Sequence, residues 1–230
     1  MYKKSNFDKF RLYVDEFVCN KFGFAELFTE NYFRLEIKPK NALDVGCGVG
    51  PLSIFLADKD IYVDAIDINP IATKLCNLNV NKYRLNKYLN IICDDFSAYN
   101  FTKKYDLIIS NPPIDISRNT IINKNIKEQV KKGCINSDIF SFITNSWKDE
   151  NYLDLLSHIF IKSRELLTKE GVIILIFGDI DKNNYLYVED LSKKYGLKIK
   201  NHIPKKIDFK KVGLPKEYEN ILAHIVVLSL

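Results

Sequence analysis

A glycine-rich turn that directly follows an apolar stretch has residue types suited to ligand binding. It runs from Leu43 to Pro51 and reads LDVGCGVGP, which indicates a strand, three alternate glycines and the start of a helix. Glycine accepts positive φ and lets the backbone approach a ligand closely, and proline suits a first helical turn because it has no N–H to leave unpaired. The spacing is G-x-G-x-G, and Pro51 stands where the third glycine of a dinucleotide site would fall. The turn therefore predicts a nucleotide-like ligand but argues against a nicotinamide oxidoreductase.

Acidic residues follow the next two predicted strands. Asp67 comes after a strand over 61–66, and Asp94 and Asp95 come after a strand over 89–93. A carboxylate at such a strand end can accept both hydrogen bonds of a ribose diol. Taken singly, Asp67 could instead cap the next helix, and the other two could form a turn. Their common position after successive strands, downstream of the glycine turn, favours a shared ligand site.

The glycine turn resembles motif I of the class I S-adenosylmethionine-dependent methyltransferases. The resemblance implies that Gly46, Gly48 and Gly50 shape the loop that holds S-adenosylmethionine. It also implies that Asp44 helps to position the amino-acid end of this cofactor, whereas the residue type alone is equally consistent with a carboxylate that stabilises the turn.

The same resemblance assigns roles to residues outside the turn. It implies that Asp67, with Ile68 beside it, contacts the ribose, and that Asp94 contacts the adenine amino group. Asp95 takes the adenine role if the register slips by one residue. Thr29 lies just before the first strand, where relatives often place cofactor contacts, and is the weakest of these candidates.

A second segment suited to chemistry follows the apolar strand predicted over 105–110. It reads Asn111-Pro112-Pro113-Ile114. Two successive prolines end a strand sharply, so the Asn111 side-chain oxygen and the Pro112 carbonyl can face a ligand without competing N–H donors. An amide or base amino nitrogen is a poor nucleophile because its lone pair is delocalised. Two acceptors for its hydrogens favour the pyramidal nitrogen that attacks a methyl group and stabilise the developing positive charge.

This tetrapeptide resembles motif IV of the amino-methyltransferases, which is commonly Asn-Pro-Pro followed by an aromatic residue. That group includes release-factor glutamine, ribosomal guanine and DNA adenine methyltransferases. The resemblance implies that Asn111 and Pro112 are catalytic, that Asn111 also contacts the cofactor, and that Pro113 and Ile114 contact the substrate. Ile114 departs from the pattern, because an aromatic side chain would stack on a planar substrate there. The order of the two motifs matches the glutamine and ribosomal guanine groups.

The elements that must hold these residues alternate regularly from residue 41 onward. We predict strands at 41–45, 61–66, 89–93, 105–110, 172–177, 197–201 and 221–228, and helices at 51–58, 70–84, 152–168 and 184–194. Repeated β-then-α order predicts a doubly wound, mostly parallel sheet. With the resemblance, the fold class is a Rossmann-like α/β fold with a seven-stranded sheet.

The domain organisation has two further expected parts. Residues 1–40 are predicted to form an N-terminal helical extension, because apolar residues recur there at helical spacing, namely Phe7, Phe10, Val14, Phe17 and Val18. Residues 41–230 form the methyltransferase domain. Within it, 111–150 is predicted to be a substrate-side insertion after the fourth strand, either a substrate-selecting lid or a surface insertion, since it is longer than most connections.

Composition narrows the functional classes. With 47% hydrophobic and 27% charged residues, the 230-residue chain is typical of a globular protein. It has no apolar run of the roughly 20 residues that a membrane span needs and no apolar signal core at its N-terminus. Its five cysteines form no C-x-x-C pair, and its three histidines are widely spaced. We therefore expect no metal, no membrane partner and a reducing cytoplasmic location.

The net charge of +5 includes a lysine-rich stretch over 193–211. Such a stretch can steer RNA or an acidic protein by long-range attraction, or it can simply be a solvated face.

Together these observations predict an S-adenosylmethionine-dependent N-methyltransferase whose acceptor is a protein glutamine side chain. An exocyclic amino group of RNA or DNA, or a small-molecule amine, is the alternative acceptor. A non-catalytic nucleotide-binding module would keep the glycine turn without needing Asn111 and Pro112.

Overall fold

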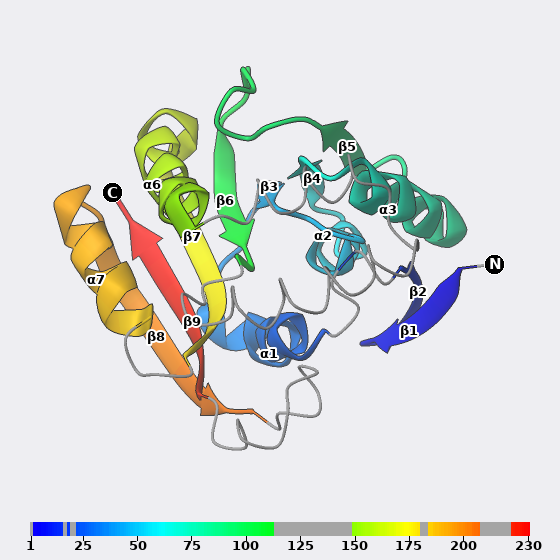
Figure 1. The fold of residues 1–230 in the computed structure, drawn as a ribbon, viewed down its shortest axis with the longest axis horizontal. Coiled ribbons are helices and arrows are strands. Elements are labelled where there is room, and N and C mark those ends of the chain that lie inside the picture. Colours follow the sequence, from blue (N-terminus) through cyan, green and yellow to red (C-terminus); the bar gives the residue numbers. More distant parts are fainter. Residues whose placement is uncertain (1, 16–17, 19–21, 113–148, 180–183, 208–221) are drawn as a thin grey trace.

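The computed structural model describes residues 2–15, 18, 22–112, 149–179, 184–207 and 222–230, with side chains in the helix beginning at Asp149 described from residue 155. Its centre is a seven-stranded sheet in the order β5-β4-β3-β6-β7-β9-β8 (Figure 1). The strands are β3 (Asn41–Val45), β4 (Tyr62–Asp67), β5 (Leu89–Cys93), β6 (Tyr105–Ser110), β7 (Leu167–Asp179), β8 (Lys198–Lys206) and β9 (Leu222–Ser229). Neighbouring strands from β5 to β7 are parallel, and β9 is antiparallel to both β7 and β8. The predicted Rossmann-like, mostly parallel sheet is confirmed.

Helices cover both faces of the sheet and bury a separate apolar cluster on each. One face carries α1 (Gly23–Asn31), the 3-10 helix η1 (Tyr32–Leu35), α2 (Pro51–Ala57) and α3 (Pro70–Tyr83). The other carries α6 (Asp149–Leu166) and α7 (Asn184–Lys194). The central strands β3, β6 and β9 are largely buried on both sides, which explains why their sequences are mostly apolar rather than alternating, whereas the edge strand β8 is largely exposed.

The helix starts are set by local sequence. Asn69 caps α3, because its side-chain oxygen accepts a hydrogen bond from the N–H of Ile71 at 2.9 Å, and Pro70 occupies the first helical turn. In α2, Pro51 likewise occupies the first helical turn. Gly50, the residue before it, has a left-handed backbone conformation. Both helices therefore start where the sequence predicts them.

The N-terminal extension differs from the prediction. Residues predicted as a helix form an antiparallel hairpin of β1 (Lys3–Phe7) and β2 (Phe10–Val14), so that part of the prediction is wrong. Phe10, Leu12 and Val14 alternate at the period of a strand and are buried on one face. The spacing of Phe7, Phe10 and Val14 fits a helix equally well, which is why sequence spacing misled. The helical part of the extension is α1.

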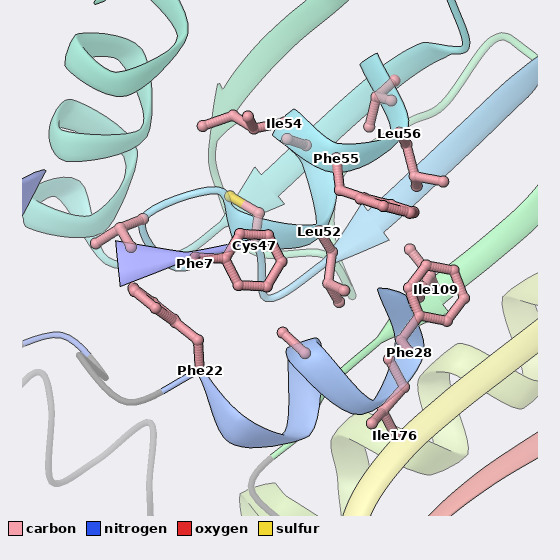
Figure 2. Packing of buried hydrophobic residues seen from close by; sticks show 14 of the residues in the cluster. Phe7, Phe22, Phe28, Cys47, Leu52, Ile54, Phe55, Leu56, Ile109 and Ile176 are labelled. Carbon is pink, nitrogen blue, oxygen red and sulfur yellow. The ribbon is translucent and has the colours of Figure 1, made fainter. Parts of the chain in front are cut away.

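The hairpin packs onto the sheet face that carries α1, α2 and α3. Phe7 is fully buried and its ring lies 5.5 Å from that of Phe22 in an edge-on contact. Figure 2 shows these rings beside Cys47 of the glycine turn and Leu52 of α2. The hairpin is thus part of the main apolar cluster rather than a separate appendage.

Two expectations fall on residues that the structure does not describe. The predicted insertion over 111–150 lies outside the described residues, except for its ends at 111–112 and 149–150. Phe17 also lies outside them. Among the described helices, none combines the length and the apolar composition that crossing a membrane would require.

Candidate functional site

The site is built at the edge of the sheet where the parallel strands end. Val45 at the end of β3 is paired with Ser110 at the end of β6. The Ser110 hydroxyl also donates a 2.8 Å hydrogen bond to the Val45 carbonyl. Because the next residues along the two strands are Gly46 and Asn111, the glycine turn and the Asn-Pro segment begin side by side.

The three glycines of the turn have different structural roles. All have positive φ, at 74° for Gly46, 56° for Gly48 and 87° for Gly50. A Cβ on Gly50 would lie 2.6 Å from the sulfur of Cys76, so this glycine allows the turn to pack against α3. A Cβ on Gly46 would meet no atom within 4 Å. Gly46 therefore borders open space at the strand edge, where a ligand can approach the backbone.

Asp67 lies at the end of β4 and is joined to the turn. One carboxylate oxygen accepts a hydrogen bond from the N–H of Gly48 at 2.8 Å, and the other accepts from the N–H of Asn69 at 2.9 Å. Burial raises the pKa of Asp67, while these two backbone donors act in the opposite direction. The cap of α3 is Asn69, so Asp67 is free of that role. Ile68 beside it is 39% exposed.

The two aspartates after β5 have separate environments. The N–H of Asp94 reaches the carbonyl of Asp67 at 3.3 Å, which brings the exposed Asp94 next to the Asp67 segment. Each carboxylate also accepts a local backbone hydrogen bond, Asp94 from the N–H of Asp95 at 2.7 Å and Asp95 from the N–H of Ser97 at 2.8 Å. Both side chains are exposed, and the backbone contact with Asp67 is what favours Asp94 over Asp95 as a ligand contact.

Asp44 lies one residue before the end of β3 and is only 1% exposed. Its carboxylate accepts a hydrogen bond from the hydroxyl of Ser53 in α2 at 2.5 Å. Burial raises the pKa of Asp44 to about 7, the Ser53 hydrogen bond lowers it, and the nearby negative charge of Asp67 raises it further. This acid is therefore poised between its neutral and charged forms near neutral pH.

The Asn-Pro segment leaves the sheet at the same edge. Asn111 is half-buried and Pro112 is buried. Among the described residues, no hydrogen bond engages the Asn111 side chain, which offers an acceptor oxygen and a donor amide nitrogen. Pro113 and Ile114 lie outside the described residues, and their predicted substrate contacts remain predictions.

Thr29 is on α1 rather than on a loop at the strand edge. Its hydroxyl donates a 2.9 Å hydrogen bond to the carbonyl of Glu26 within the same helix. The structure therefore gives its hydroxyl a local partner, and its cofactor contact remains a prediction. In the part of the chain that is described, no three His, Cys, Asp or Glu side chains gather as metal ligands.

Sequence reasoning missed one buried polar residue that organises the site. Asn79 of α3 is fully buried, and its amide nitrogen donates to the carbonyls of Val49 and Tyr13, each at 3.0 Å. Its oxygen accepts from the N–H of Tyr13 at 2.6 Å. Asn79 thus fastens the hairpin to the glycine turn. One feature of the sequence could have revealed it: Asn79 falls at helical spacing among apolar residues, on the buried face of the predicted helix. A polar residue at such a position is expected to be hydrogen-bonded.

Comparison with known proteins places the chain in a family. A model of the methyltransferase small domain family matches residues 25–175. The tRNA1(Val) (adenine(37)-N6)-methyltransferase of Aliivibrio fischeri is 41% identical over 73 residues, which are 31% of this chain and 31% of that protein. The release factor glutamine methyltransferase of Salmonella typhimurium is 28% identical over 148 residues, 63% of this chain and 49% of that protein. The matches therefore span between about a third and a half of these relatives.

A solved structure agrees in fold. The tRNA (uracil-54, C5)-methyltransferase of Pyrococcus abyssi, in complex with S-adenosyl-L-homocysteine, superposes with a TM-score of 0.60 at 15% identity, covering 99% of this chain and 44% of that one. At that identity the likeness shows the fold alone. The family match, however, covers well over half of the chain. The chain therefore belongs to the methyltransferase small domain family, and its sequence-based assignment to the class I S-adenosylmethionine-dependent methyltransferases is confirmed.

Proposed function

We propose that this protein is an S-adenosylmethionine-dependent N-methyltransferase that acts on a planar amino or amide nitrogen. The observation that supports this most strongly is the pairing of Val45 with Ser110, which starts the glycine turn and the Asn-Pro segment at adjacent positions. A cofactor loop and a nitrogen-holding segment must be neighbours if a methyl group is to pass between their ligands.

The residues of the strand edge fit the cofactor. Gly46 borders open space, and Ile68 offers an exposed apolar side chain. The Asp67 carboxylate uses one acceptor site on each oxygen for backbone N–H groups, and a carboxylate has about four such sites. It can therefore still accept hydrogen bonds from a ribose diol. Exposed Asp94 is suited to the adenine amino group.

The bound cofactor supplies an electrophilic methyl group on a positively charged sulfur. The chain's own part is to hold the acceptor nitrogen in line with it. In our proposal the Asn111 side-chain oxygen and the Pro112 carbonyl accept hydrogen bonds from the two N–H groups of the acceptor. These bonds strengthen as the nitrogen becomes positively charged, so they stabilise the transition state more than the bound substrate.

Two acceptor classes have support among the relatives. The release factor glutamine methyltransferase favours a protein glutamine, the acceptor predicted from the sequence. The tRNA adenine-N6 methyltransferase favours an exocyclic amino group of RNA. Both acceptors present a planar NH₂ group, so both suit the same pair of acceptor oxygens. A small-molecule amine remains the third candidate, and methyl-labelled S-adenosylmethionine incubated with fractions of protein, RNA, DNA and small molecules would separate the three.

Substitution of Asn111 tests the catalytic proposal. We expect Asn111→Ala to bind S-adenosylmethionine normally in calorimetry but to lose methyl transfer by about a hundredfold or more, because one acceptor that stabilises the developing charge is removed. Asn100→Ala, an exposed asparagine on the loop after β5, is the matched control and should transfer methyl groups at the wild-type rate. Unchanged transfer by Asn111→Ala would favour a non-catalytic or differently organised site.

A further inference from the structure

The outer side of the N-terminal hairpin and the adjoining part of α3 form a basic and aromatic surface. We call it the hairpin surface and define it by Lys4, Arg11, Tyr13, Lys82 and Tyr83. The three cationic side chains are exposed, and the two tyrosines are half-buried. The residues come from β1, β2 and the last turns of α3, which lie side by side in Figure 1.

The charges of the hairpin surface come from two lysines and one arginine. Within the described residues, Lys4, Arg11 and Lys82 form no ion pair with a carboxylate. Lys9 at the hairpin turn differs, since its ammonium is 2.5 Å from the Asp58 carboxylate. Among the residues that the structure describes, these three side chains therefore carry positive charge without an ion-pair partner.

The two lysine ammonium groups lie over tyrosine rings. The Lys4 ammonium lies 5.1 Å from the centre of the Tyr13 ring, and the Lys82 ammonium lies 5.1 Å from Tyr13 and 4.9 Å from Tyr83. The Tyr83 hydroxyl binds the backbone of Arg11: it accepts a hydrogen bond from the backbone N–H at 2.6 Å and donates one to the backbone carbonyl at 3.0 Å. Ordered cations interleaved with aromatic rings are the combination that single-stranded nucleic acids bind, through phosphates and stacked bases.

The opposite flank of α3 also lacks acidic residues. A groove of about 420 Å³ lies between α3 and β5. Its lining consists of Pro70, Thr73, Lys74, Asn77, Val80, Asn86, Leu89, Asn90, Ile91 and Cys93. The groove begins beside Cys93, at the strand edge that carries the candidate cofactor residues. A polyanion lying over α3 therefore meets no carboxylate along this groove.

The hairpin surface is connected to the cofactor turn by buried polar contacts. Asn79 bonds both backbone groups of Tyr13 and also the carbonyl of Val49 in the turn. Val18, just beyond the hairpin, approaches Gly48, since a Cβ there would be 3.8 Å from a Val18 methyl carbon. The hairpin is consequently held in a fixed position relative to the glycine turn, and so is any ligand that binds to the hairpin surface.

The lysine-rich stretch predicted as a possible RNA site has different surroundings. Lys193 pairs with Glu189 and Asp190, and Lys205 pairs with Glu30. Lys198, Lys200 and Lys206 lie on β8, the edge strand of the sheet, where lysine commonly prevents edge-to-edge association. Lys210 and Lys211 lie outside the described residues. This stretch is on the side of the molecule opposite to the hairpin (Figure 1).

We propose that the hairpin surface binds the phosphodiester backbone of a single-stranded nucleic acid and thereby docks the methyl acceptor beside the cofactor turn. This rests on the proposed N-methyltransferase function, and it selects a nucleic acid from the acceptor classes that the site chemistry leaves open. RNA and DNA share the chemistry that the surface recognises, so the experiment compares them.

The test measures binding of fluorescently labelled 20-nucleotide single-stranded RNA and DNA by anisotropy over a range of salt concentrations. The variant K4Q/R11Q/K82Q removes three cations, and K198Q/K200Q/K206Q removes three from β8. We expect the hairpin variant to bind at least one of the two nucleic acids at least tenfold more weakly. Its salt dependence, as the slope of log K against log salt, should become shallower by about 2. The β8 variant should bind as the wild type does.

Three results would overturn the proposal. They are equal binding by the hairpin variant, a loss confined to the β8 variant, and poly-glutamate binding with the same affinity as the nucleic acids. If the triple variant does not fold, K4Q/R11Q keeps the Lys82 contact with the Arg11 carbonyl and should still weaken binding severalfold. Affinity for S-adenosylmethionine and methyl transfer are measured separately. Nucleic-acid binding by the hairpin surface without any methyl transfer would refute the proposed function and the docking of a methyl acceptor, and would leave only the nucleic-acid binding. Transfer to a protein with no nucleic-acid binding would refute this inference alone.

Discussion

Asp44 carries a carboxyl group that is partly protonated at neutral pH. It is 1% exposed, its pKa is raised to about 7 mainly by burial, and its partner is the Ser53 hydroxyl. The resemblance assigns Asp44 to the amino-acid end of the cofactor, which carries an ammonium group. A carboxyl that becomes charged only near pH 7 would attract this ammonium in a pH-dependent manner.

We therefore predict that the affinity for S-adenosylmethionine rises as the pH increases from 6 to 8, by about tenfold, because the ionised fraction of Asp44 increases through that range. Asp44→Asn keeps an acceptor for Ser53 but cannot ionise, so its affinity should not show this step. Calorimetry at pH 6, 7 and 8 measures both proteins. A wild-type affinity that stays constant over these values would contradict an electrostatic role for Asp44.

Sequence reasoning at the residue scale identified positions better than it identified roles. Asp67 and Asp94 lie together at the strand edge as predicted, but the pattern could not show that Asn69 caps α3 or that Asp95 supports a turn. Those assignments depend on which N–H group each oxygen faces. Several side chains of similar chemistry compete for the same donors within two or three residues, and only the folded geometry decides between them.

In the glycine turn, different glycines are required for different reasons. Gly50 is limited by the protein itself, since a Cβ there would lie 2.6 Å from the Cys76 sulfur. Gly46 is limited only by its φ of 74°, since the space beside it is open. Alanine at the two positions should therefore produce separable defects.

We predict that Gly50→Ala lowers the free energy of unfolding by about 2–4 kcal/mol, from backbone strain and overpacking against Cys76. Gly46→Ala should cost only about 1 kcal/mol but should greatly weaken S-adenosylmethionine binding, because its methyl group fills space that the ligand needs. Urea unfolding and calorimetry on both variants provide the comparison. Normal cofactor affinity in a folded Gly46→Ala variant would place the ligand elsewhere.

At the same scale, several of the elements that were predicted well have glycine or proline at one end. The strand after residue 40, the strand ending at Ser110 and the helix after Asn69 all match closely. The hairpin was missed because its turn is Asp8-Lys9, without a glycine, and Asp8 itself adopts φ of 48°. An aspartate can take this conformation at modest cost in free energy. The turn therefore needs no glycine, and the sequence does not indicate where it lies.

Over the whole molecule, the fold joins histidines that are widely separated in the sequence. His202 of β8 and His224 of β9 lie with ring nitrogens 2.7 Å apart, and the planes of the two rings are nearly parallel. Phe177 of β7 stacks on His224, and Tyr185 of α7 stacks on both imidazoles. The Asp179 carboxylate is 3.5 Å from the other nitrogen of His224. We therefore place a proton on Nε2 of His224, the nitrogen that faces Asp179. Nδ1 of His224 then accepts a hydrogen bond from Nε2 of His202.

This arrangement predicts a pH dependence of stability. Burial, together with the neighbouring His202, lowers the pKa of His224 to about 4, and burial also lowers that of His202, with Asp179 and Glu189 as the opposing charges. Because the unfolded chain binds more protons than the folded one between pH 4 and 6.5, the free energy of unfolding should fall as the pH decreases through that window. For His224 the loss is about 2–3 kcal/mol.

His224→Gln should reduce this slope, because glutamine does not titrate. Urea unfolding at pH 7.5, 5.5 and 4.5 compares it with the wild type. An equal loss of stability in both proteins would assign the acid sensitivity to other groups. No sequence pattern predicts the pair, because the register between β8 and β9, set by their many backbone bonds, is what brings the rings together.

The Val45–Ser110 pairing also has a consequence for the tolerance of the chain to changes in length. One residue inserted into or deleted from β6 would shift Asn111 along the edge by about 3.3 Å and turn its side chain to the opposite face of the sheet. Loops around the sheet can vary in length without that effect. Descendants of this sequence should therefore conserve the number of residues in β3 and β6 at least as strictly as the identity of the side chains that line them.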